Sequence, residues 1–195
     1  MAKWFENVTL EGRYVLVEPL SMRHNDDLVE AVNDGNLHEL WYTTVPSPEA
    51  MADDIERRLN LSSMLPFSVI EKASGKAIGM TTYMNIDANY RKLEIGSTWY
   101  RKSAQKTPIN TESKLLLLSH AFEELDCICV EFRTHYLNIQ SRKAIERLGA
   151  KLDGILRSNM IMPNGTIRDT AVYSIIASEW PTVKANLTWR FSQSQ

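Results

Sequence analysis

A polar loop that leads into a helix is the part of this sequence best suited to bind an anion. The loop covers residues 101–107 and follows an apolar strand pattern. Thr107 and Pro108 suit an N-cap and a first helical residue, and Asn110 with Thr111 offers a second cap one turn on. The free N–H groups and positive dipole end of such a helix attract a phosphate or carboxylate. A capped helix without a ligand explains the same residues, so further features must decide.

Cysteine and histidine chemistry is less promising. Cys127 and Cys129 are one residue apart in an apolar run. In a strand their side chains point the same way, and so short a pair is neither a disulfide framework nor a four-ligand zinc site. We expect buried, reduced thiols. His120 lies among leucines in the strongest helix pattern, so we interpret it as a packing residue.

The composition is that of an ordinary soluble globular protein. The 195 residues include 22 Lys plus Arg and 24 Asp plus Glu, a net charge of −2, and 44% are hydrophobic. No basic excess favours nucleic acid or an anionic membrane as a partner. The N-terminus lacks an apolar signal core, and no stretch of about 18 residues is free of charge. We therefore expect a cytoplasmic protein with one domain over residues 1–195.

The N-terminal third reads as a strand and two helices. Residues 12–19 form a strand pattern that ends at a proline, which cannot donate to a ladder. Apolar spacing and a Ser-Pro start predict helices over about 24–33 and 47–61. Between them, Trp41 and Tyr42 could line a groove or pack in the core.

The rest of the chain reads as an antiparallel meander followed by alternating helices and strands. The expected elements are strands 67–71, 77–86 and 92–100, helix 111–125, strand 127–134, helix 138–148, strands 149–157 and 169–176, and an amphipathic C-terminal stretch. This order predicts an α/β (α+β) fold with a mixed sheet and helices on its faces. It lacks the regular alternation and glycine fingerprint of a dinucleotide-binding fold.

Four stretches, taken in this order of elements, resemble the GNAT superfamily of acetyl-CoA-dependent N-acetyltransferases. They are residues 93–96, 105–111, 138–154 and 173–176. The third is the most specific: an Asn and then a Ser open a helix that closes on a Leu-Gly turn, with Ala150 where the family usually has an aromatic residue. The resemblance covers nearly the whole chain, especially to the branch that acetylates ribosomal-protein N-termini (RimL/RimJ-like). It implies a GNAT-like, mostly antiparallel central sheet flanked by helices, with a splayed strand pair that holds the cofactor.

The resemblance implies acetyl-CoA as the cosubstrate and no metal. In the family, the splayed strand offers backbone groups to the pantetheine arm, and the loop with the helix start binds the pyrophosphate. The cofactor-binding residues implied here are Ser97, Thr98, Trp99, Tyr100, Gln105, Lys106, Thr107, Ile109, Asn110, Thr111 and Asn138. The family loop usually reads Gln/Arg-x-x-Gly-x-Gly/Ala, whereas here Pro108 removes one N–H donor and Asn110 adds bulk. We expect the remaining N–H groups and the Lys106 side chain to preserve the cradle.

The family's reaction needs no covalent enzyme intermediate, because the amine attacks the thioester directly in a ternary complex. Glu94 matches a strand position from which some members direct a general base, and Ser141 matches the hydroxyl that protonates the departing thiolate. Ordinary structural roles explain the same residues: Glu94 could pair with Lys92 or Arg91 at the surface, and Ser141 could serve the start of its helix together with Asn138.

The free energy needed to deprotonate the attacking amine indicates which class of acceptor amine is favoured. At pH 7, neutralising a lysine amine costs about 4.6 kcal/mol, against about 1 to 1.4 kcal/mol for an α-amine. Since the sequence shows no cluster of strong bases, we favour a protein or peptide α-amine or a small-molecule amine, with Trp41 and Tyr42 as candidate substrate-binding residues. A catalytically inactive CoA-binding or interaction protein on the same fold is the alternative. A longer acyl donor is open, as are a monomer and a homodimer.

Overall fold

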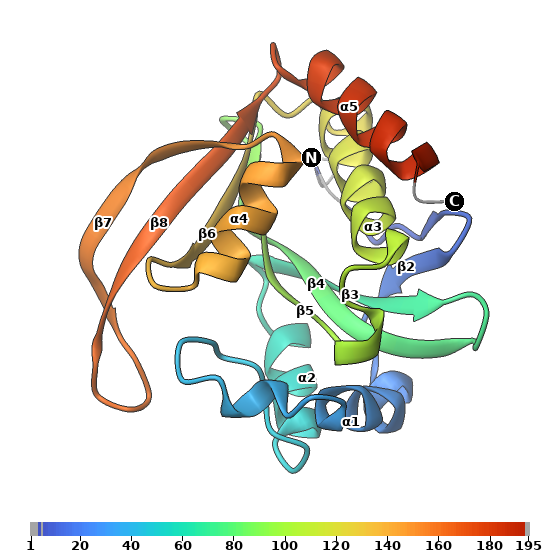
Figure 1. Cartoon of the computed structure of the whole chain (residues 1–195), viewed down its shortest axis with the longest axis vertical. Coiled ribbons are helices and arrows are strands. Elements are labelled where there is room, and N and C mark those ends of the chain that lie inside the picture. The colour runs from blue at the N-terminus through green and yellow to red at the C-terminus, as the bar shows by residue number, and fades with distance from the viewer. Residues whose placement is uncertain (1–3, 5, 194–195) are drawn as a thin grey trace.

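One eight-stranded sheet organises residues 4 and 6–193, which the computed structural model describes (Figure 1). In spatial order its strands are β1 (Leu10–Glu11), β2 (Val15–Pro19), β3 (Met64–Glu71), β4 (Lys76–Asp87), β5 (Lys92–Tyr100), β6 (Cys129–His135), β8 (Ile167–Ile176) and β7 (Lys151–Ile161). Neighbouring strands are antiparallel except β5 and β6, which are parallel. The predicted mixed, mostly antiparallel sheet is therefore confirmed.

Helices cover both faces of this sheet. They are α1 (Asn25–Asn33), α2 (Met51–Leu59), α3 (Pro108–Ser119), α4 (Ile139–Leu148) and α5 (Trp180–Gln193), and a π-helical segment (His120–Glu124) continues α3. Side chains of α3, α4 and α5 share one buried cluster with the sheet, and side chains of α1 and α2 share another. Ile78 of β4 belongs to the first cluster and its neighbour Ala77 to the second, so the two clusters lie on opposite faces.

The strand β5 joins two parts of the sheet that then diverge. It pairs with β4 over most of its length, but with β6 only from Lys92↔Cys129 to Glu94↔Glu131. Beyond that point β6 continues to pair with β8 alone. We call residues 95–100 of β5 and 132–135 of β6 the splay. The predicted splayed strand pair is thus present.

A β-bulge bends β5 inside the splay. Two residues, Ser97 and Thr98, stand opposite one residue of β4, Thr81, where the antiparallel register shifts. Ser97 has a φ of 47°, in the left-handed region that a non-glycine residue rarely adopts. The bulge increases the local bend of β5 and so turns it away from β6.

Several element boundaries predicted from sequence need correction, for example β3, which starts at Met64 and not at residue 67, and α2, which covers Met51–Leu59 and not 47–61. The helix predicted to start at residue 111 starts at Pro108, because Thr107 takes the N-cap position and proline is well tolerated at the first helical position. The strand predicted over 12–19 starts at Val15, after a turn in which the Gly12 N–H donates to the Val15 carbonyl (2.8 Å). The strand predicted to end at residue 157 continues past an irregular register to Ile161.

The cysteines are both free, but they differ in exposure. Cys127 is buried, as predicted, and Cys129 is only half-buried. The expectation that both point the same way in one strand was wrong, because β6 begins at Cys129 and Cys127 precedes it. Neither thiol has a disulfide partner, which agrees with the prediction of reduced cysteines.

Candidate active site

The first turn of α3 is open to an anionic ligand. The Thr107 hydroxyl does not cap the helix but donates to a loop carbonyl 2.7 Å away. Pro108 supplies no N–H group. The remaining free donors of this turn are the backbone N–H groups of Ile109 and Asn110, because in an α-helix the carbonyl of the N-cap residue Thr107 already accepts the Thr111 N–H. No acidic residue lies in the turn, so the positive end of the helix dipole is not offset by a carboxylate there.

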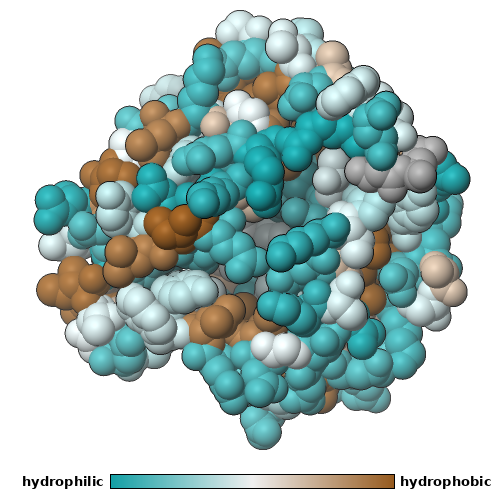
Figure 2. All heavy atoms as spheres, in the orientation of Figure 1, coloured by the Kyte–Doolittle hydropathy of each residue, from teal (hydrophilic) through white to brown (hydrophobic). Residues whose placement is uncertain are grey.

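The loop before α3 reaches the start of α4. Gln105 Nε2 donates to the Tyr100 carbonyl (3.1 Å), and Gln140 Nε2 donates to Gln105 Oε1 (3.4 Å). Lys106 is exposed and has a φ of 62°. Between α3 and α4, Figure 2 shows a hollow edged largely by hydrophilic residues. The loop, the first turn of α3 and the start of α4 therefore border one opening.

The edge of β5 that faces β6 has no strand partner within the splay. The backbone groups of residues 97–99 that point to this edge are therefore available to a ligand, whereas the Tyr100 carbonyl accepts from Gln105 Nε2. The side chains are used elsewhere: Trp99 packs in the cluster of α1 and α2, and Tyr100 packs in the cluster of α3. The geometry fits the backbone role predicted for these residues and leaves no ligand-binding role for the Trp99 and Tyr100 side chains.

Glu94 lies at the base of the splay. It is the last residue of β5 paired with β6, and it is only 5% exposed. Leu93 and Ile95 face the α3 cluster, so Glu94 points to the opposite face of the sheet. Asn85 Nδ2 donates to Glu94 Oε2 (2.7 Å), and Arg133 Nε lies 3.6 Å from the same oxygen. This carboxylate is thus held by one amide and one guanidinium.

Burial raises the pKa of Glu94, although the Asn85 hydrogen bond and the Arg133 charge oppose the shift. A carboxylate with a raised pKa is a stronger proton acceptor once it is ionised, which suits a general base. Gly96 provides the space for it, because a Cβ at Gly96 would lie 2.8 Å from Glu94 Oε1. The electrostatic setting of Glu94 therefore agrees with the role predicted for it.

The surface ion pairs considered as an alternative for Glu94 do not form. Lys92 Nζ lies 3.9 Å from Glu131, and Arg91 pairs with Asp126. Both cations point to carboxylates other than Glu94. The interpretation of Glu94 as a surface carboxylate paired with either of them was wrong.

An aromatic residue from the loop between α1 and α2 borders the same face. The Trp41 ring lies edge-on to the His135 ring (centroids 5.3 Å apart) and to the Tyr42 ring (5.5 Å). His135 shares its face of β6 with Arg133, which contacts Glu94. Trp41 is 49% exposed, so it is a surface residue and not part of the core. The structure therefore brings Trp41 and Tyr42 to the Glu94 side of the splay.

Sequence reasoning missed several polar residues around Glu94. Asn85 and Arg133 contact it, and the Glu94 charge acts on Arg168 of β8, whose own pKa is lowered by burial. A signal existed for Arg133, because it alternates with the buried Phe132 and Thr134 along β6. No comparable pattern marks Asn85 or Arg168.

Ser141 and Asn138 approach the splay from the other face. Asn138 is the N-cap of α4, and its Oδ1 accepts the Ser141 backbone N–H (3.0 Å). The predicted capping role of Asn138 is therefore confirmed. That bond involves the backbone N–H of Ser141, and the Ser141 hydroxyl takes no part in it. Because Ile145 of α4 packs in the α3 cluster, α4 lies on the face opposite Glu94.

The chain matches the model of the acetyltransferase (GNAT) domain over residues 14–151. It belongs to this family. Over 106 residues it is 34% identical to a Bacillus subtilis (strain 168) protein provisionally named ribosomal N-acetyltransferase YdaF, a match that covers 54% of this chain and 57% of that protein. The match thus spans less than two thirds of the relative's length.

Solved structures of GNAT proteins are similar over nearly the whole chain. A GCN5-related N-acetyltransferase from Brucella melitensis is 32% identical with a TM-score of 0.88, covering 99% of this chain and 92% of that chain. A T. thermophilus protein provisionally described as an acetyltransferase is 33% identical with a TM-score of 0.85, covering 96% and 99%. These matches confirm the predicted GNAT fold and an acetyltransferase enzyme, and the GNAT domain implies use of acetyl-CoA in general.

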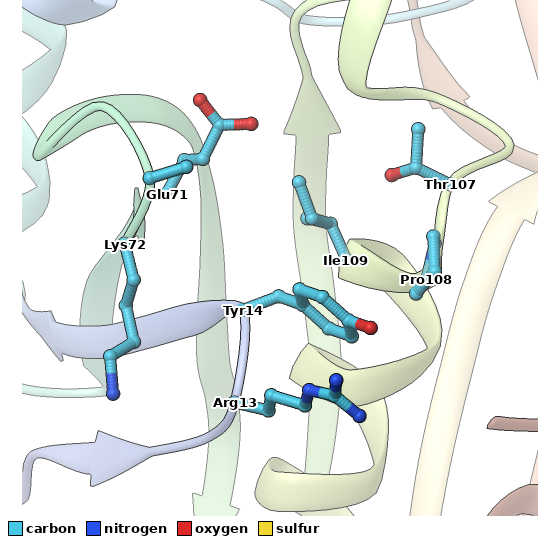
Figure 3. A pocket seen from close by; sticks show the side chains of 8 residues that line it. Arg13, Tyr14, Glu71, Lys72, Thr107, Pro108 and Ile109 are labelled. Atoms are coloured by element: carbon cyan, nitrogen blue, oxygen red, sulfur yellow. The ribbon is translucent and has the colours of Figure 1, made fainter. Parts of the chain in front are cut away.

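Two further cavities border the GNAT site. One, of about 470 Å³, adjoins the first turn of α3 and lies beside β2 and the β3–β4 turn. Figure 3 shows the Tyr14 side chain pointing toward α3. Its cations already have partners: the Arg13 guanidinium lies 5.2 Å from the Tyr14 ring centre, and Lys72 Nζ lies 2.6 Å from Glu11 Oε1. The other, of about 450 Å³, lies on the Glu131 side of β6, β8 and β7.

The described residues include neither a candidate metal cluster nor a membrane-spanning helix. Among the described residues, no group of three or more His, Cys, Asp and Glu side chains could hold a metal ion. Within residues 4 and 6–193, no helix is long and apolar enough to cross a bilayer.

Proposed function

We propose that this protein transfers the acetyl group of acetyl-CoA to an α-amine, by direct attack within a ternary complex, in the cytoplasm. The observation that carries the proposal is the position of Glu94. It is a buried carboxylate with a raised pKa, at the base of the splay and on the face opposite α3 and α4. The amine would approach from that face, and acetyl-CoA from the other.

The residues on the α3 side fit the parts of acetyl-CoA. The N–H groups of Ile109 and Asn110 and the Lys106 ammonium would bind the pyrophosphate, because no side chain caps the turn and it contains no acidic residue. The free edge of β5 would bind the pantetheine arm through its backbone. Asn138 would contact the same arm through the part of its amide that does not cap α4. The thioester would then lie at the splay.

The chemistry assigns one proton transfer to each face. The amine nitrogen attacks the thioester carbonyl carbon and forms the C–N bond, the C–S bond breaks, and the thiolate leaves. Glu94 takes the proton that the nitrogen loses, directly or through one water, and Ser141 gives its hydroxyl proton to the thiolate. Glu94 then releases its proton to solvent and Ser141 regains one from solvent, so the enzyme returns to its starting state and the products are an amide and the CoA thiol.

An α-amine acceptor suits a site in which Glu94 is the proposed general base. Glu94 is the buried carboxylate at the splay, and one general base removes a proton more easily from an α-amine than from a lysine amine. Trp41 and Tyr42 would line the groove that receives the acceptor chain. The name of the Bacillus subtilis relative supports a ribosomal-protein N-terminus, as in the RimL/RimJ-like branch, as the first acceptor to test.

The test is a thiol-release assay with acetyl-CoA and matched peptides. One peptide has a free α-amine and a blocked lysine, its partner has a blocked α-amine and a free lysine, and a set of small amines completes the panel. We expect release with the free α-amine and mass-spectrometric location of the acetyl group there. Turnover only with lysine or small amines would refute the acceptor, and no turnover with any amine would refute the enzymatic proposal.

A CoA-binding protein without catalysis is the second candidate. The observation that favours it is Asn110, whose side chain occupies a first-turn position where the family usually has a small residue. Calorimetry with acetyl-CoA separates the candidates. Binding without turnover would favour this second function, and absence of binding would exclude both.

A further inference from the structure

Lys114 is a buried cation that the proposed chemistry does not use. It lies in α3, six residues after Pro108, and is 6% exposed. Its Nζ donates to Thr98 Oγ1 (2.8 Å) and to Thr81 Oγ1 (3.2 Å). Burial lowers its pKa to about 7, and no other group contributes to the shift. Among the ion pairs of the described residues, none includes Lys114.

Both hydrogen-bond partners of Lys114 belong to the β-bulge. Thr81 of β4 stands opposite Ser97 and Thr98 of β5. The two threonine hydroxyls lie 2.8 Å apart, and Thr98 Oγ1 also lies 3.3 Å from the Gly96 carbonyl. A bulge interrupts the ladder and leaves backbone groups unpaired. The Lys114 ammonium therefore supplies polar contacts where the ladder between β4 and β5 is weakest.

A lysine in this space costs free energy that an apolar side chain would not. Burying an ammonium without a carboxylate costs several kcal/mol unless hydrogen bonds compensate, and an apolar side chain of similar volume avoids that cost. Leu117 and Leu118 of the same helix show that the interface with the sheet accepts apolar residues. Specific contacts to the bulge are what Lys114 adds over a leucine or methionine.

We propose that Lys114 is a positioning residue that holds the β5 bulge against α3 and thereby sets the distance between the two surfaces that bind acetyl-CoA. One surface is the free edge of β5, and the other is the first turn of α3. The inference rests on the proposed function. It adds that affinity for acetyl-CoA depends on a buried side chain behind the binding surfaces.

The experiment compares Lys114→Met with a matched control, Tyr83→Phe. The Tyr83 hydroxyl donates to the Leu117 carbonyl (2.6 Å), so this control also removes a buried polar contact between β4 and α3. It does not touch the bulge. Thr98→Val removes one of the two hydroxyls that Lys114 Nζ contacts, and it serves if Lys114→Met does not fold.

Two readouts are taken on the whole protein. Hydrogen exchange without ligand follows the amides of residues 95–100, and calorimetry measures the dissociation constant for acetyl-CoA. We expect Lys114→Met and Thr98→Val to speed exchange there and to weaken binding by about tenfold or more, with the double variant weaker by less than the product of the two effects. Tyr83→Phe should lower the melting temperature, because it removes a buried hydrogen bond. It should nevertheless leave both the exchange over residues 95–100 and the affinity for acetyl-CoA near wild type.

Equal losses of affinity in Lys114→Met and Tyr83→Phe would reduce Lys114 to a stabilising residue and overturn the inference. Unchanged exchange over residues 95–100 in Lys114→Met would overturn it as well. If wild type does not bind acetyl-CoA, the proposed function fails together with the link to affinity, and the exchange data still decide whether Lys114 holds the bulge.

Discussion

The strongest stability prediction concerns Glu112, which ties α3 to the start of β2. Glu112 is 4% exposed, and its carboxylate accepts the backbone N–H groups of Arg13 (2.5 Å), Tyr14 (2.8 Å) and Val15 (3.0 Å). Replacement by alanine removes all three hydrogen bonds at once. The three donors lie just after Gly12, where a Cβ would clash with the Glu112 carboxylate. The contact is therefore close and specific.

The expected cost follows from the three hydrogen bonds. Each bond to a charged acceptor contributes about 1.5–3 kcal/mol, so their sum is an upper bound of about 4.5–9 kcal/mol. Two of the three bonds, those from Arg13 and Tyr14, are only partly buried, so water replaces part of the loss. We expect Glu112→Ala to lower the free energy of unfolding by about 3–5 kcal/mol, near the upper end for single substitutions. For a chain of this size that lowers the melting temperature by roughly 6–20 °C.

Urea denaturation followed by circular dichroism measures this loss directly. Glu124→Ala is the matched control, since Glu124 is an exposed glutamate in the π-helical segment that continues α3. The control should stay within about 0.5 kcal/mol of wild type. If Glu112→Ala were as stable as Glu124→Ala, the three bonds would contribute nothing net, and the tie between α3 and β2 described here would be refuted.

Four further predictions concern the active site. Glu94→Gln should lower kcat about 10²–10⁴-fold with little change in acetyl-CoA affinity, because it removes the proton acceptor; unchanged kcat would exclude Glu94 as the base. Since burial raises the Glu94 pKa, wild-type stability relative to Glu94→Gln should fall as pH rises through that pKa, which denaturation at several pH values measures. Ser141→Ala should lower turnover more than acetyl-CoA affinity in steady-state kinetics and calorimetry, whereas equal losses would make Ser141 a structural residue. Gly96→Ala should lower kcat, because its Cβ would lie 2.8 Å from Glu94 Oε1 and displace the carboxylate; wild-type kcat would show that the carboxylate tolerates the shift.

Local rules account for the parts of the fold that sequence predicts well. The start of α4 follows from Asn138 as an N-cap. The helix predicted from residue 111 was placed three residues late, because the local rule that favours a start at Pro108, a threonine before a proline, competed with a second possible cap at Asn110 and Thr111. The order of strands and helices limits the sheet to a mixed topology. What local rules do not give is the β-bulge, because it depends on how β4 and β5 pair across a turn.

The residues around Glu94 could not be predicted from the sequence, because they too depend on how distant strands pair. Arg133 is far from Glu94 in sequence, and the two meet only because β5 and β6 pair in parallel over a few residues. Trp41 was ambiguous, since its exposure depends on whether another element covers it; the structure places it beside His135 at the surface. Lys114, which directly precedes a run of four leucines, gave no sign of burial, because its partners come from the two strands β4 and β5.

The brief pairing of β5 with β6 has a consequence for cooperativity. Strands β2 to β5 form one set of neighbours along the chain, and β6, β8 and β7 form a second set. Three residue pairs connect the sets within the sheet, whereas α5 and α3 connect them through the core. The second set is the natural unit of partial unfolding, and its amides should exchange together. A ligand that fills the splay binds both sets at once, and so it should make the whole domain unfold as a single unit.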